Sequence, residues 1–171
     1  MLFVSGALRS QCDRGRSRLS HLTVTPNAVV EAPIERVWSL LTRPDGFHLW
    51  VDAAMVAAEP EGRARPGQQL HLVTKALGWA FAITIEIAEV DAERHRLRFQ
   101  VELPFGVVDD QVVTMSTAEG ERTHVSYVAD YSFPPGWWGQ VLWALRARGL
   151  RRGTVDSLRR LKRAVEAPPA P

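Results

Sequence analysis

The alternation of hydrophobic and polar residues over the middle of the chain predicts a series of β-strands that each have one buried face. Hydrophobic side chains recur at every second position in residues 79–87 and 97–103, and polar or small residues stand between them. Turn-forming residues separate such stretches, so the pattern predicts an antiparallel meander. The predicted strands centre on residues 53–59, 70–72, 79–87, 97–103, 113–115 and 125–133.

Two short helices are predicted before this meander. A β-branched segment at residues 21–32, broken at Pro26, is expected to form the first strand. Hydrophobic residues at helical spacing follow it from Ile34 to Leu41. Because Pro44 to Gly46 ends that helix, residues 47–50 can form only a short second one.

One long helix is predicted after the meander. Pro134 to Gly136 ends the sheet, and hydrophobic residues then keep helical spacing from Trp137 to about Glu166. Such a helix must lie across the apolar face of the sheet. Gly149 and Gly153 each disfavour the helix by up to about 1 kcal/mol relative to alanine, which predicts a kink or a close backbone approach near its middle.

The composition fits a single domain. The chain has 171 residues, of which 46% are hydrophobic, and it can bury a substantial core. We expect residues 21–166 to form the domain, with a disordered basic extension at 1–20 and a disordered tail at 167–171. Cys12, the one cysteine, is expected to be a free surface thiol. Arginines follow the apolar first residues instead of preceding them, the reverse of a secretory signal, so a cytoplasmic location is expected.

Basic residues are concentrated near the C-terminus. Residues 146–171 contain eight basic and two acidic side chains, whereas residues 21–145 contain nine basic and sixteen acidic ones. Trp137 and Trp138 precede the arginines at Arg146 to Arg152, a combination that is typical of a membrane interface. Peripheral membrane contact there is one hypothesis, and no binding of nucleic acid is expected. The interpretation that we favour is a solvated helix face whose tryptophans pack on the sheet.

The sequence lacks the motifs of the common catalytic and metal sites. It contains no His-Glu-x-x-His, Cys-x-x-Cys or Gly-x-Ser-x-Gly motif, and its five histidines are scattered. Neither a metal nor a cofactor is therefore expected, and no catalytic residue is assigned. Only Asp109, Tyr127 and Tyr131 are placed to act as an acid or base in an interior.

A curved sheet over one long helix leaves a space between them, which the side chains of the strands either fill or line as a cavity. Asp109 and Gln111 are candidates for polar groups at one end, although we favour a solvated strand start at Asp109 and Asp110. The expected cavity residues are Trp79, Phe81, Ile83, Phe99, Val101, Asp109, Gln111, Met115, Tyr127, Tyr131, Leu142 and Leu145. For each of them taken singly, ordinary core packing is the alternative.

Two segments, VVEAPIERVWSLLTRPDGFHLW and TVDSLRRLKRAVE, carry a resemblance to a known superfamily. Together with the order of the predicted elements, they resemble the START/Bet v 1-like superfamily SRPBCC, nearest its polyketide cyclase/dehydrase-like bacterial branch. The most specific part is the Ala-Pro-x-x-x-Val-Trp pattern that begins at Ala32, followed by the aromatic residues of Phe47 to Trp50. The resemblance covers about residues 21–166.

This resemblance implies an α+β helix-grip fold, in which a curved antiparallel sheet of about seven strands wraps around a long C-terminal helix. Two short helices follow the first strand. It also implies a deep hydrophobic cavity, which the superfamily uses for lipids, sterols, polyketides, quinones and plant hormones. We therefore expect binding or transport of a hydrophobic small molecule or lipid. The alternatives are a polyketide cyclase, aromatase or dehydrase-like enzyme, and a non-catalytic interaction module with a filled core.

Overall fold

The structure, a computed structural model, describes residues 21–76 and 79–167. The predicted N-terminal extension, Cys12 and nearly all of the predicted C-terminal tail lie outside the described residues. The elements are β1 (His21–Val24), β2 (Asn27–Val30), α1 (Ile34–Leu41), η1 (Pro44–Leu49), β3 (Ala54–Glu59), β4 (Gln68–Ala76), β5 (Trp79–Asp91), β6 (Arg96–Leu103), η2 (Pro104–Gly106), β7 (Val107–Ala118), β8 (Arg122–Ser132) and α2 (Trp137–Glu166).

The described strands form one antiparallel sheet in the order β1-β8-β7-β6-β5-β4-β3, and β2 also pairs with β8. β1 and β2 follow one another along β8. Between them, Pro26 has no N–H to donate to the ladder, and its carbonyl accepts a hydrogen bond from the Tyr127 backbone N–H at 3.0 Å. The break predicted at this proline thus divides the first strand in two, so the sheet has eight strands where about seven were expected.

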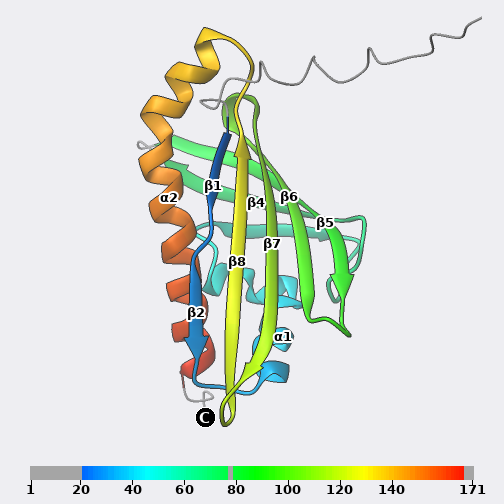
Figure 1. The fold of residues 1–171 in the computed structure, drawn as a ribbon. Coiled ribbons are helices and arrows are strands. Elements are labelled where there is room, and N and C mark those ends of the chain that lie inside the picture. The colour runs from blue at the N-terminus through cyan, green and yellow to red at the C-terminus, as the bar shows by residue number, and fades with distance from the viewer. Residues whose placement is uncertain (1–20, 77–78, 168–171) are drawn as a thin grey trace, which may run out of the picture.

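The long helix α2 lies alongside β1 and β2 (Figure 1). Its C-terminal half is buried against the sheet through Leu158, Leu161 and Val165. The same end is fixed to the start of the domain, because the Glu31 backbone N–H donates to Glu166 Oε1 at 2.8 Å. The helix and the sheet are therefore held together firmly at the end where α2 finishes.

An aromatic cluster fills part of the space between the sheet and the helix. The ring centroids of Phe47 and Trp50 lie 5.1 Å apart, and Phe99 of β6 lies 5.6 Å from Phe47. Tyr127 of β8 meets Trp50 edge to face at 6.4 Å. Edge-to-face and tilted contacts of this kind stabilise aromatic clusters beyond the area that they bury. The segment after α1 thereby closes one end of the interior.

The glycines of α2 differ in their surroundings. The helix continues through Gly149 and Gly153, and a Cβ atom added at either glycine would meet nothing within 4 Å. The close backbone approach predicted at these two positions is therefore wrong. It occurs at Gly139 instead, where an added Cβ would lie 1.7 Å from the Pro134 carbonyl oxygen.

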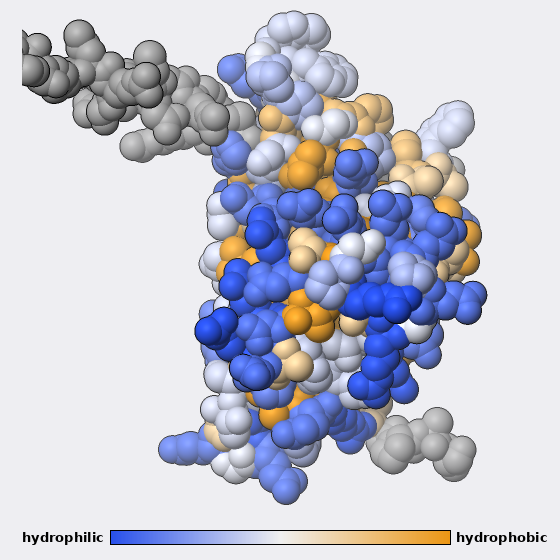
Figure 2. Space-filling model, turned by 90° about the vertical axis from the view of Figure 1, so that its right-hand side faces the viewer, coloured by the Kyte–Doolittle hydropathy of each residue, from blue (hydrophilic) through white to orange (hydrophobic). Residues whose placement is uncertain are grey.

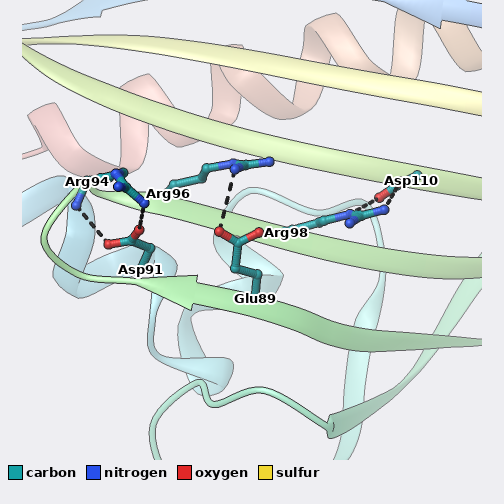
Figure 3. Close-up of polar contacts among 6 residues, drawn as sticks. All are labelled: Glu89, Asp91, Arg94, Arg96, Arg98 and Asp110. Carbon is teal, nitrogen blue, oxygen red and sulfur yellow. Dashed lines mark hydrogen bonds and ion pairs between the residues drawn. The ribbon is translucent and has the colours of Figure 1, made fainter.

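Polar side chains cover most of the molecular face opposite α2, with hydrophobic residues scattered between them (Figure 2). Figure 3 shows an ion-paired cluster on the strands of the sheet. Its pairs are Arg94 with Asp91 at 3.3 Å, Arg96 with Glu89 at 3.5 Å and Arg98 with Asp110 at 2.8 and 2.5 Å. Exposed pairs of this kind contribute at most about 1 kcal/mol each, so they keep this face solvated more than they stabilise the fold.

Candidate functional site

A cavity of about 200 Å³ lies between the inner face of the sheet and α2. Its wall is mainly apolar and comes from η1, β5, β6, β7, β8 and the middle of α2. Seven of the residues expected from the sequence line it: Ile83, Phe99, Val101, Asp109, Gln111, Tyr127 and Tyr131. The alternation of the strands therefore brings these side chains together around one space.

A second, outer pocket of about 340 Å³ adjoins this cavity. Both are lined by Thr74, Leu103, Gly149 and Leu150, so the two pockets lie side by side. The expected residues Phe81, Leu142 and Leu145 line only the outer pocket. Leu145 is 73% exposed and Phe105 of η2 is 55% exposed. The outer pocket is therefore mainly apolar and open to solvent, and we call it the mouth.

Two of the expected residues lie elsewhere. Trp79 is the first residue of β5 and is 74% exposed, so its assignment to the cavity wall is wrong. Alternation places it on the same face as Phe81, but it stands at the end of the strand, beyond the cover of the helix. Met115 is buried in the main core, where it pairs with Val125 across the strands. For Met115, core packing was the correct alternative.

A chain of hydrogen bonds forms the polar part of the inner cavity. The Tyr127 hydroxyl donates to Gln111 Oε1 at 2.6 Å, and Gln111 Nε2 donates to Asp109 Oδ2. The Thr154 hydroxyl donates to the Leu150 carbonyl at 2.9 Å. The Tyr131 hydroxyl and Thr154 Oγ1 share a hydrogen bond of 2.7 Å, and Tyr131 also interacts with Asp109 by a hydrogen bond. Both tyrosine hydroxyl groups therefore make hydrogen bonds within the protein.

Asp109 is only 1% exposed, so the solvated strand start favoured from the sequence is wrong for this residue. Successive side chains of β7 point to opposite faces of the sheet. Asp110 consequently points to the solvated face, where it pairs with Arg98, while Asp109 points to the cavity. Two adjacent carboxyl groups thus have opposite environments.

Burial raises the pKa of Asp109 to about 7, although the hydrogen bonds from Gln111 and Tyr131 oppose the rise. Asp110 and Asp130 add to it through their negative charges. Burial likewise raises the pKa values of Tyr127 and Tyr131 above the ordinary tyrosine value. Near neutral pH both tyrosines are neutral, and Asp109 is divided between its protonated and ionised forms.

Part of the wall of the inner cavity was not predicted from the sequence. Phe47 and Trp50 close one end of the inner cavity, and Thr154 contributes to its polar part. The aromatic residues were noticed as part of a family pattern and not as a lining. A signal for α2 was present as well, because small residues recur at Gly149 and Gly153 beside its apolar face, where side chains would otherwise occupy the space.

No group of three or more His, Cys, Asp or Glu side chains in residues 21–76 and 79–167 is arranged to hold a metal ion. Across the same residues, no helix has both the length and the hydrophobicity needed to cross a bilayer.

A curved antiparallel sheet with a long C-terminal helix and two short helices defines the Bet v 1-like helix-grip fold of the SRPBCC superfamily. The model of the family "Polyketide cyclase / dehydrase and lipid transport" matches residues 21–166, and the chain belongs to that family. No curated protein sequence matches the chain.

Solved structures share the fold at low sequence identity. The protein TTHA0849 from Thermus thermophilus is 22% identical, with a TM-score of 0.62 over 84% of this chain and 97% of that one. A truncated norcoclaurine synthase from Thalictrum flavum is 15% identical, with a TM-score of 0.64 over 86% and 95%. Ara h 8.0201 is 12% identical, with a TM-score of 0.58 over 85% and 97%.

Proposed function

We propose that this protein binds a hydrophobic small molecule or lipid in the inner cavity and carries it without chemical change. The observation that carries the proposal is an apolar cavity of about 200 Å³ that adjoins an open pocket. A dry cavity of about 150 Å³ is enough to hold a benzene molecule. The inner cavity alone therefore suits one or two rings, and the adjoining pocket of about 340 Å³ has room for a further ring. The presence of the cavity argues against a filled core.

Filling the space beside Gly149 and Gly153 is expected to weaken binding strongly. Gly149 lines both pockets and Gly153 lines the inner one, and neither has an atom within 4 Å of an added Cβ. In the double variant Gly149→Leu/Gly153→Leu, the new side chains occupy this space. We expect the affinity for the neutral fluorophore N-phenyl-1-naphthylamine to fall at least about tenfold, measured by its fluorescence increase.

The control for this test is the double variant Arg148→Leu/Arg152→Leu. It adds leucines one residue before each glycine, where both arginines are exposed. Its affinity for the fluorophore should equal that of the wild type. Equal binding by the glycine variant, or no binding by the wild type, contradicts the proposed site.

A second candidate function is acid–base chemistry on a bound polyketide, as in a cyclase or dehydrase. The observation that favours it is one buried carboxyl group, Asp109, whose pKa is raised to about 7 and which faces the cavity. Mass spectrometry of guests recovered after incubation separates the two functions. A guest released unchanged supports carriage, whereas a guest that has lost water supports the enzyme.

We further propose that the mouth contacts an anionic membrane during loading. Trp137 is 75% exposed, and Trp138 and Leu145 are exposed beside it on the same half of α2. Arg146 lines the outer pocket, and Arg148 is exposed one turn away from Leu145. Tryptophan rings at the depth of the headgroups and arginines that meet phosphate groups suit such a surface.

Removing the two tryptophans is expected to reduce membrane binding severalfold. The variant Trp137→Ala/Trp138→Ala is compared with the wild type by co-sedimentation with vesicles of phosphatidylcholine and phosphatidylserine. The control Leu49→Ala/Val56→Ala removes exposed hydrophobic side chains from η1 and β3 and should bind as the wild type does. Equal, negligible sedimentation of all three proteins excludes the membrane contact.

A further inference from the structure

The residues that precede β1 join the domain beside the mouth. His21, the first residue of β1, pairs with Ser132 of β8, and Ser132 pairs on its other side with Val108 of β7. Val108 comes three residues after Phe105, which lines the mouth. Because adjacent strands lie about 4.8 Å apart, His21 is within roughly 20 Å of Phe105. The start of β1 also lies at the same end of the molecule as the start of α2, the helix that supplies Leu145 to the mouth (Figure 1).

The mouth exposes apolar side chains that the described residues do not cover. Leu145 is 73% exposed and Phe105 is 55% exposed. Arg146 is the one charged residue in the part of the lining that the structure describes. Exposed apolar patches of this kind mark sites of interaction. A cavity of about 150 Å³ holds one benzene molecule, so the mouth, at about 340 Å³, has room for two side chains of that bulk.

Residues 1–8 provide an uncharged apolar sequence, MLFVSGAL. Residues 9–18 instead contain four arginines and one aspartate. The positive charge of Arg146 disfavours an arginine-rich stretch in the mouth, whereas it does not oppose an apolar one. Charge and hydrophobicity therefore both select residues 1–8 over residues 9–18 as an occupant.

The length of the intervening chain suits a return to the mouth. Residues 9–20 separate the apolar sequence from His21. A flexible chain of twelve residues spans about 20 Å on average and about 40 Å when fully extended. The average span thus matches the distance between His21 and Phe105. An intramolecular contact is favoured most when the length of the linking chain matches the span, and the effective concentration is then in the millimolar range.

We propose that residues 2–8 dock in the mouth of the same chain, where they compete with a guest. The docking itself depends only on the mouth and on the N-terminal sequence, whereas the competition rests on the proposed binding function. The docked segment covers Phe105 and Leu145 from solvent, and a guest that extends into the mouth must displace it. The N-terminal sequence thereby lowers the affinity for guests.

Cross-linking tests the docking directly. Cys12 is the one cysteine of the chain, so a Cys12→Ser background has no thiol. In that background, Val4→Cys/Leu145→Cys places one thiol in the segment and one in the mouth, and a short bismaleimide joins them where they meet. Val4→Cys/Glu121→Cys is the matched control, because Glu121 lies in the turn between β7 and β8, at the opposite end of β8 from Ser132. We expect cross-linking within one chain to be at least about tenfold faster for the Leu145 pair.

A further pair of variants separates docking from proximity alone. Leu2→Ser/Phe3→Ser removes two apolar side chains from the segment and keeps its length. We expect it to slow the cross-linking to Leu145→Cys at least about fivefold, because the burial of these side chains stabilises the docked state. Leu19→Ser removes an apolar side chain from the connecting chain and should leave the rate unchanged.

The same segment is expected to weaken guest binding. N-phenyl-1-naphthylamine has three rings, so it extends from the inner cavity into the mouth. We expect deletion of residues 1–8, or Leu2→Ser/Phe3→Ser, to raise its affinity about fivefold and Leu19→Ser to leave the affinity unchanged. Fluorescence titration of each protein measures the difference.

The outcomes separate the docking from the proposed function. Equal cross-linking rates for the Leu145 and Glu121 pairs, or a rate that Leu2→Ser/Phe3→Ser does not change, overturn the docking. Cross-linked dimers assign the segment to the mouth of a second copy and overturn it as well. If the wild type binds the fluorophore and deletion leaves the affinity unchanged, the competition is overturned. If no protein binds the fluorophore, the binding function fails, and the cross-linking still decides the docking.

Discussion

The Asp109→Asn variant is expected to gain stability relative to the wild type as the pH rises from about 5 to about 8. Burial raises the pKa of Asp109 from 3.8 to about 7 in the folded protein. Between these values the folded chain holds a proton that the unfolded chain has released. The wild type is therefore stabilised fully below the unfolded pKa, and it loses this contribution as the pH rises through the folded pKa. Asparagine does not titrate, so its contribution stays constant.

The expected change is large. Each pH unit in this window corresponds to about 1.4 kcal/mol, so the wild type loses about 3 kcal/mol relative to Asp109→Asn between pH 5 and pH 8. Urea unfolding of both proteins at the two pH values measures it. Taking the difference between the proteins cancels the titration of every other group.

The matched variant for this experiment is Asp110→Asn. Asp110 and Asp130 oppose each other on β7 and β8, and both raise the pKa of Asp109 through their charges. Removing Asp110 should shift the transition of Asp109 only slightly, because its main cause is burial. A difference between the wild type and Asp109→Asn that does not change with pH contradicts a buried, titrating carboxyl group.

Alanine at Gly139 is expected to destabilise the fold by about 3 kcal/mol, which lowers the melting temperature by roughly 10 °C. The added Cβ would lie 1.7 Å from the Pro134 carbonyl oxygen, a backbone atom that cannot move without displacing the segment before α2. Thermal unfolding followed by circular dichroism measures the effect.

Gly153→Ala provides the comparison within the same helix. It meets no atom within 4 Å and restricts the unfolded chain, so we expect it to stabilise the protein by up to about 1 kcal/mol. The two substitutions are chemically identical and differ only in position. Equal melting temperatures for the two variants are incompatible with the close approach at Gly139.

The strand periodicity predicted most of the fold, because alternation along a strand directly records which face is buried. The inner positions of β5 and β6, such as Ile83, Phe99 and Val101, were assigned from this signal alone and line the cavity. The resemblance over residues 21–166 added the position of the long helix, and the family match covers the same residues. The structure that the strand periodicity favours locally therefore agrees with the overall fold, as is typical of sequences that fold well.

Some surroundings could not be predicted from the sequence, because they depend on where α2 ends and on which residues it covers. Trp79 lies on the expected face but beyond the helix, so its strand pattern resembles that of a wall residue. Asp109 stands in an acidic dipeptide that is typical of solvent, and only the distant segments over it make it buried. The clash at Gly139 depends on the direction of the Pro134 carbonyl, which propensities do not encode.

The position of the mouth beside the inner cavity has a consequence for selectivity. The polar side chains of Asp109, Gln111 and Tyr127 line the inner cavity, whereas the mouth is lined by Phe105 and Leu145 and opens to solvent. Under the proposed function, a guest held by its head in the inner cavity would extend its tail into the mouth. Homologues that share one head and differ in tail length would then meet the same recognition groups, and the surplus carbons would rest on the protein surface or in a bilayer. The protein would discriminate by the chemistry of the head and tolerate variation in the tail.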